Sequence, residues 1–230
     1  MKRVMLTLTA VMFTVMLMAA PQSAHADLVI SQIYGGGGAT STNPLYSNDW
    51  VQLYNDGTSA IDLSGYSLQY ASATNTTTFG PSNSHNLSGI INPNSYFLIQ
   101  EGRGTGLVGT APDPAYDLTL GTFAGLNLSA TAGKLALFDT TATGASTVAT
   151  SANLVDLVGY GTTANFSLYP RMTANPSTTT AAIRTTDAGG NTIFIAGTPD
   201  PNPVATPIPA AVWLFGSGLA GLIEMRRKQS

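Results

Sequence analysis

Apolar and polar residues alternate in short runs along the middle of the chain. In the run DWVQLYN, Val51 and Leu53 fall on one face of an extended segment. The opposite face receives Trp50, Gln52 and Tyr54. Because successive side chains of a strand point to opposite faces, this pattern predicts a β-strand.

Other short runs rich in β-branched and aromatic residues repeat the pattern. In GKLALFD, Leu135 and Leu137 share one face, opposite Ala136 and Phe138. Four more runs belong to the same class: DLVISQIY, GYSLQYAS, SYFLIQ and NLVDLVGYG. Between residues 27 and 203, no stretch of about ten residues has apolar positions at helical spacing. Many short strands separated by turns predict an all-β antiparallel sandwich or barrel.

Turn-forming residues separate these runs. Asn55-Asp56-Gly57 and Ser64-Gly65 each place a glycine where a sharp reversal would need a positive φ. Pro93 fixes φ in a turn just before the predicted strand at 96–100. The run IYGGGG predicts a flexible loop after the first strand. It does not fit a phosphate loop, because no Lys follows at the required spacing and no helix pattern begins there.

The N-terminal segment has the layout of a secretory signal. Two basic residues at positions 2 and 3 precede an apolar run at 4–20. Ala24 and Ala26 then supply the small residues that a signal peptidase reads, which predicts cleavage before Asp27. We therefore expect residues 1–26 to form a signal helix that directs export and is removed.

The C-terminal segment predicts a membrane anchor. A Pro-rich linker at 199–206 leads into an apolar run at 208–223. Arg226, Arg227 and Lys228 follow at once and would stop transfer on the cytoplasmic side of a transmembrane helix.

Charge and composition exclude several functions for the region between these segments. Residues 27–203 hold eleven acidic residues against four basic ones, and the chain has no cysteine. Nucleic-acid affinity rests mainly on Lys and Arg that neutralise phosphates, so we expect no nucleic-acid partner. Without disulfides, the exported domain must be stable through burial alone.

Candidate catalytic and metal-binding residues are few. His85 is the one histidine after the signal segment, and no nucleophile elbow precedes a predicted helix. We expect His85 to lie in a polar loop or at a strand edge rather than to act in catalysis. With one His and no Cys, no catalytic metal site is expected. The runs APDPAYD and NDGTSAID hold oxygen ligands, which leaves a structural calcium ion open.

Aromatic residues offer a candidate binding surface. Trp50, Tyr66, Tyr70 and Tyr96 would form a stacking surface for sugars if they were exposed. The competing hypothesis is that they pack across strands or between sheets. The sequence leaves both open and favours packing.

The order of these motifs resembles a known family. The runs LVISQIYGGGG, NDWVQLYNDGTSAIDLSGYSLQYAS, LSATAGKLALFD, LVDLVGYG and AAIRTTDAGGNTIFIAGTPDPNP look like the bacterial lamin tail domain. The resemblance implies an immunoglobulin-like antiparallel β-sandwich over residues 27–198. In bacteria this module is often attached to extracellular nucleases or phosphatases, and it also occurs in surface proteins without an enzyme. We expect the second situation here.

The tail, residues 207–230, resembles the PEP-CTERM class of sorting signals in its VPLPA variant, with PIPA in place of the Pro-Glu-Pro version. The resemblance implies processing by an exosortase in the inner membrane of a Gram-negative bacterium. The predicted motif residues are Pro207, Ile208, Pro209, Ala210, Trp213, Phe215, Gly216 and Gly218. The implied destination is the outer surface or the extracellular matrix.

The sequence thus predicts a non-enzymatic, exported β-sandwich protein of the cell envelope or matrix, structural or adhesive in role. Its predicted partners are signal peptidase and an exosortase-type protease. The protein is expected to pass through the inner membrane during export. The alternative is an accessory module that binds extracellular polysaccharide or another surface protein. A cryptic hydrolase is the third hypothesis.

Overall fold

A computed structural model describes residues 28–40, 42–75, 78–79, 83–121, 124–141, 146–147 and 152–202. The predicted signal helix and the predicted C-terminal transmembrane helix lie outside these residues. Among the residues described, no helix has the length and apolar character needed to cross a membrane.

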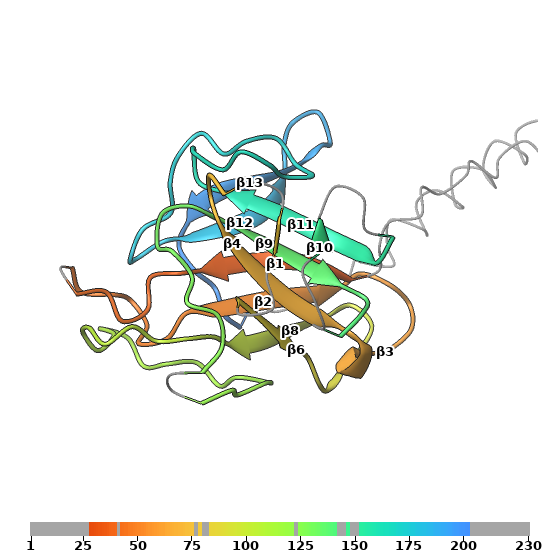
Figure 1. The fold of residues 1–230 in the computed structure, drawn as a ribbon, viewed down its shortest axis with the longest axis horizontal. Coiled ribbons are helices and arrows are strands. Elements are labelled where there is room, and N and C mark those ends of the chain that lie inside the picture. The colour runs from red at the N-terminus through yellow and green to blue at the C-terminus, as the bar shows by residue number, and fades with distance from the viewer. Residues whose placement is uncertain are drawn as a thin grey trace, which may run out of the picture.

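Two antiparallel sheets are stacked face to face (Figure 1). The five-stranded sheet has the order β13 (Thr192–Gly197), β12 (Ala181–Thr186), β1 (Leu28–Tyr34), β2 (Trp50–Asn55) and β8 (Ser95–Gln100). The four-stranded sheet has the order β11 (Leu154–Tyr160), β9 (Gly133–Phe138), β4 (Ser67–Ser72) and β6 (Ser84–Asn86). The prediction of an all-β antiparallel sandwich is confirmed.

Short elements complete the described part of the fold. They are the pair β3 (Ile61–Asp62) and β7 (Ile90–Ile91), the pair β5 (Thr78–Phe79) and β10 (Ser146–Thr147), and the 3-10 turn η1 (Leu63–Gly65). No α-helix occurs among the described residues.

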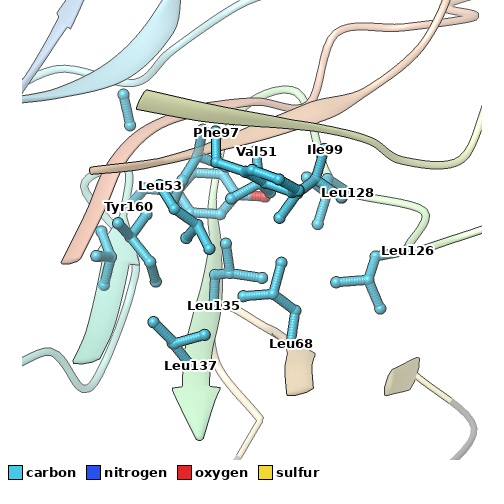
Figure 2. Close-up of a cluster of buried hydrophobic side chains, with 14 of the residues drawn as sticks. Val51, Leu53, Leu68, Phe97, Ile99, Leu126, Leu128, Leu135, Leu137 and Tyr160 are labelled. Atoms are coloured by element: carbon cyan, nitrogen blue, oxygen red, sulfur yellow. The ribbon is translucent and has the colours of Figure 1, made fainter. Parts of the chain in front are cut away.

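The main core fills the space between the sheets. Val51 and Leu53 of β2 point toward Leu135 and Leu137 of β9, as Figure 2 shows. All four side chains are fully buried, so the faces predicted from the alternation are confirmed. The burial of this apolar surface supplies the main driving force for folding, which the chain needs because it has no cysteine for disulfides.

The outer faces of both sheets are also covered. Trp50 is fully buried on the outside of the five-stranded sheet, with Tyr34 and Leu98 beside it. Ala136 and Phe138 are buried on the outside of the four-stranded sheet, so β9 is buried on both faces. The loops that cover these faces belong to the same chain.

The glycine-rich segment after β1 is closely packed, contrary to the expectation of a flexible loop. A Cβ at Gly37 would lie 2.2 Å from the Asn48 carbonyl carbon. Gly38 has φ +61, and a Cβ there would lie 2.5 Å from the Gly104 amide nitrogen. Close approach of backbone segments therefore explains these glycines.

The prediction of positive φ at Gly57 and Gly65 is wrong. The Asn55 side chain closes the first turn instead, because Oδ1 accepts from the Gly57 amide at 3.0 Å and Nδ2 donates to the Ser59 carbonyl at 2.8 Å. At the second turn, Asp62 accepts from the Ser64 amide at 2.9 Å and caps η1. Side-chain capping removes the need for left-handed backbone at both places.

Candidate functional site

His85 lies on β6, an edge strand of the four-stranded sheet, as expected, and its ring faces a buried carboxylate. His85 Nε2 is 2.8 Å from Glu101 Oε1, and Glu101 is fully buried. The second imidazole nitrogen, Nδ1, lies 3.2 Å from the Asn86 carbonyl. Glu101 Oε2 accepts from the Leu126 amide at 2.7 Å. The pair therefore ties three separate segments of the chain together.

A second buried carboxylate lies close to this pair. Asp49 accepts from the Gly37 amide and from the Leu128 amide, each at 2.8 Å. Its own amide donates to the Gly102 carbonyl at 2.9 Å, which links it to the segment after Glu101. Asp49 and Glu101 thus hold two neighbouring loops through their main-chain amides. Both carboxylates satisfy backbone donors at the end of the sandwich where β2 begins and β8 ends.

Burial sets the protonation behaviour of these groups. Burial raises the pKa of Glu101, and the bonds from His85 and the Leu126 amide only partly offset it. Burial also raises the pKa of Asp49 well above its usual value, with the charge of Glu101 acting in the same direction. Burial acts to lower the pKa of His85, but the hydrogen bond and charge of Glu101 outweigh it and raise that pKa.

We expect the melting temperature of the domain to fall as pH rises from acidic to mildly alkaline values, because the pKa values of Asp49, Glu101 and His85 are all raised in the folded state. A pKa raised on folding means that the folded state binds the proton more tightly than the unfolded state. The stability from that proton is therefore full below the unfolded pKa and is lost as pH rises through the folded one. His85→Gln keeps a donor for Glu101 and removes the titration, so the profile above about pH 6.5 should become flatter. Thermal melts over this range measure both effects. A native profile that rises with pH, or an unchanged profile in the variant, would contradict this assignment.

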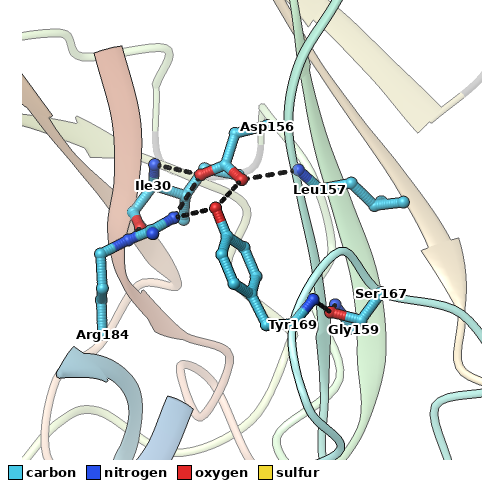
Figure 3. Close-up of polar contacts among 7 residues, drawn as sticks. All are labelled: Ile30, Asp156, Leu157, Gly159, Ser167, Tyr169 and Arg184. Carbon is cyan, nitrogen blue, oxygen red and sulfur yellow. Dashed lines mark hydrogen bonds and ion pairs between the residues drawn. The ribbon is translucent and has the colours of Figure 1, made fainter. Parts of the chain in front are cut away.

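A second polar network, formed around Asp156 of β11, was not predicted from the sequence (Figure 3). Asp156 Oδ2 accepts from the Ile30 amide at 2.8 Å and binds the Arg184 guanidinium. Asp156 Oδ1 accepts from the Leu157 amide at 2.8 Å and from the Tyr169 hydroxyl at 2.7 Å. The carboxylate thus joins β1 and β12 of one sheet to β11 of the other.

Arg184 is held from several sides. Its Nε donates to the Ile30 carbonyl at 2.7 Å, and its guanidinium donates to the Tyr169 hydroxyl at 3.0 Å. The guanidinium carbon lies 4.6 Å from the centre of the Tyr169 ring and 5.0 Å from the centre of the Phe194 ring. Both Asp156 carboxylate oxygens, the Tyr169 hydroxyl and the Arg184 Nε and Nη2 atoms are bonded within the fold, so the network serves the packing of the two sheets.

The four candidate aromatic residues divide between core and surface. Trp50 is fully buried and stacks on Tyr34 at 5.6 Å between ring centres. Tyr66 and Tyr70 are partly buried and pack against the main core. Tyr96 is half-buried and lies against Tyr54, with ring centres 4.6 Å apart. The packing hypothesis is therefore correct for all four residues, and Tyr96, which packs across strands on Tyr54, stays half-exposed.

The two candidate calcium loops use their carboxylates to bind backbone amides. Asp113 accepts from the Ser47 amide and Asp117 accepts from the Leu98 amide, each at 2.7 Å. Asp62 caps η1 in the other loop. Among the described residues, no group of three or more His, Cys, Asp or Glu side chains is placed to hold a metal ion.

The predicted targeting residues all fall outside the described part of the chain. They are Ala24, Ala26 and Asp27 of the peptidase site, the sorting motif from Pro207 to Gly218, and the basic residues Arg226, Arg227 and Lys228.

The C-terminal end of the described domain is bound to the outer face of the five-stranded sheet. Gln32 Nε2 donates to the Asp200 carbonyl at 2.8 Å, and Gln32 Oε1 accepts from the Asp200 amide at 3.0 Å. Gln52 Nε2 donates to the Pro201 carbonyl at 3.1 Å. Both glutamines are buried, so the segment after β13 is part of the folded domain.

Comparison with known proteins identifies the fold family. The chain is similar to a solved structure of a DUF4876 family protein from Bacteroides thetaiotaomicron, with 12% identity and a TM-score of 0.46. That similarity covers 75% of this chain and 68% of the other. No curated protein matches the sequence. A family model for the lamin tail domain matches residues 21–162, a range that includes β1 to β11. The chain therefore belongs to the lamin tail domain family.

Proposed function

We propose that this protein is a non-enzymatic component of the cell envelope or extracellular matrix, exported and then sorted by an exosortase-type protease. Its lamin tail sandwich serves as a structural or adhesive unit, in an immunoglobulin-like arrangement of two sheets. The destination is the outer surface or matrix of a Gram-negative bacterium. Signal peptidase and the exosortase are the processing partners.

The non-enzymatic part of the proposal rests on one observation: the buried ionisable groups bind other groups of the fold. His85 is bonded through both ring nitrogens, and its partner Glu101 also binds a backbone amide. Asp49 and Asp156 each accept from two backbone amides, and Arg184 binds Asp156. A general base needs a free acceptor within reach of the proton that it removes. These groups instead stabilise the sandwich.

The sorting part is supported by the sequence of the tail together with the attachment of the preceding segment. Pro201 is bound to Gln52 on the sandwich, and residues 202–206 separate it from the predicted motif. At roughly 3.5 Å per residue, those residues reach at most about 20 Å. A chain held in the membrane at 208–223 would therefore keep its sandwich close to the membrane surface, where a membrane protease acts.

Intact-mass analysis of the native protein, fraction by fraction, tests this proposal. The form at the outer surface or in the matrix should start at Asp27 and lack the residues from the transmembrane segment onward. The inner membrane should contain a smaller amount of the uncut form. A full-length tail in every fraction would reject the sorting part of the proposal.

A second candidate function, binding of extracellular polysaccharide, is favoured by the pair of Tyr54 and Tyr96. These rings are half-buried on the outer face of the five-stranded sheet and are close enough to form one aromatic platform. A glycan array on the domain separates this function from a purely structural one, with Tyr54→Ala as the variant that should lose any signal. A hydrolase screen with and without calcium, with His85→Ala as control, addresses the third hypothesis.

A further inference from the structure

β13 forms one edge of the five-stranded sheet and has none of the usual features that prevent edge pairing. It pairs with β12 in a regular register over six residues, from Ala181 opposite Gly197 to Thr186 opposite Thr192. Its sequence, TIFIAG, contains no charged residue and no proline. Natural edge strands are usually short, charged, bulged or covered, because an open edge is a template for another strand.

Two other edges of the sandwich are covered by the chain itself, and a third is short. At β8, Leu118 accepts from the Gln100 amide at 2.9 Å, and its own amide donates to the Leu98 carbonyl at 3.1 Å. At β11, the Leu168 amide donates to the Leu157 carbonyl at 3.2 Å. β6 is only three residues long. Among the described residues, no main-chain bond reaches β13 from the side away from β12.

The described residues on either side of β13 turn away from this edge. After Gly197 the chain turns back over the sheet, where Gln32 binds Asp200. Before Thr192, the Asp187 carboxylate accepts from the amides of Gly189 and Asn191, at 2.8 and 2.9 Å, and fixes the hairpin turn. β13 is therefore held in place by a defined hairpin, and residues 198–202, the described part of the segment that follows, make no main-chain bond to its far edge.

The side chains of β13 add an apolar strip to this edge. Phe194 is buried in the core and anchors the strand. Ile193 and Ile195 point to the opposite face, where Ile195 pairs with Ile183 and is 45% exposed. A strand added beyond β13 would cover Ile195 and satisfy the open main-chain groups at the same time.

We propose that β13 pairs antiparallel with β13 of a second copy of this chain, about a two-fold axis, so that the two sheets become continuous. The domain carries an excess of negative charge, so two identical copies repel each other. The repulsion is weakest where the facing surfaces carry no charged residue. The uncharged strand is such a surface. With the two-fold axis at Phe194, Ile193 of each copy lies opposite Ile195 of the other, and the two Asp187 turns lie at opposite ends of the interface.

The oligomeric state of residues 27–202, which include all three core clusters, tests this proposal. Sedimentation equilibrium should show a reversible dimer in the native domain. Ile195→Lys should raise the dissociation constant at least about 100-fold, because Lys on an edge strand prevents pairing. Val108→Lys is the matched control, since Val108 is 67% exposed in a loop, and it should dimerise as the native domain does. Equal melting temperatures for the two variants at low concentration would show that Ile195→Lys is folded.

Hydrogen exchange identifies the interface directly. The amides of β13 should gain protection as the protein concentration rises, while the amides of β8 should not change. A native domain that stays monomeric at all concentrations would overturn the proposal. So would dimerisation of Ile195→Lys at native affinity, or concentration-dependent protection outside β13. A β13 that pairs only with a strand of a different protein would appear as the monomeric outcome.

Discussion

Replacing Asp156 with Ala should lower the free energy of unfolding by about 3–5 kcal/mol, a large share of the stability of a single domain. The carboxylate is 1% exposed and binds the amides of Ile30 and Leu157, the Tyr169 hydroxyl and the Arg184 guanidinium. Its removal leaves a partly buried cation without its counter-charge and two amides without an acceptor. Urea denaturation followed by circular dichroism measures the loss.

A matched control and a double variant make this prediction specific. Asp139→Ala removes a carboxylate from an exposed residue just after β9 and should change stability by less than about 0.5 kcal/mol. Adding Arg184→Met to Asp156→Ala removes the uncompensated cation and should restore part of the loss. A loss below about 1 kcal/mol in Asp156→Ala would show that the network contributes little to the packing of the sheets.

The faces of the strands could be predicted from the sequence because they depend on local alternation alone. Val51 and Leu53 share a face whatever else the chain does, and burial of that face follows from their apolar character. The residues that cover the opposite face of this strand could not be predicted. Trp50 is buried there by its neighbour on β1, Tyr34, and by Tyr46, whose position depends on how the loop between β1 and β2 folds back.

The polar networks could not be predicted, since they join residues that lie far apart in the chain. The Ile30 amide and Asp156 are 126 positions apart, and Glu101 binds an amide 25 positions away. In the sequence, the run APDPAYD, which contains Asp113, leaves a calcium ion open because carboxylate oxygens suit calcium as well as backbone donors. The structure shows that Asp113 binds the Ser47 amide, 66 positions away. The residue type predicts a hydrogen-bond acceptor, but the donor that it binds depends on the fold.

Replacing Pro207–Ala210 with Ala or Ser should leave the protein unprocessed in the inner membrane. If the apolar run at 208–223 served only as an anchor, its length and hydrophobicity would suffice, and a change at the membrane edge would have no effect. A protease that reads the motif requires those side chains, so cleavage should be lost almost completely. The intact mass of the protein in each cell fraction distinguishes the two cases.

Changing Arg226, Arg227 and Lys228 to Gln should act differently and serves as the comparison. The basic cluster retains the tail on the cytoplasmic side, so its loss should weaken the stop to transfer and let some chains pass through uncut. The motif variant should therefore accumulate in the inner membrane, whereas the basic variant should appear uncut beyond it. Normal processing of the Pro207–Ala210 variant would show that the tail is an ordinary anchor, and the outer-surface destination would then lose its support.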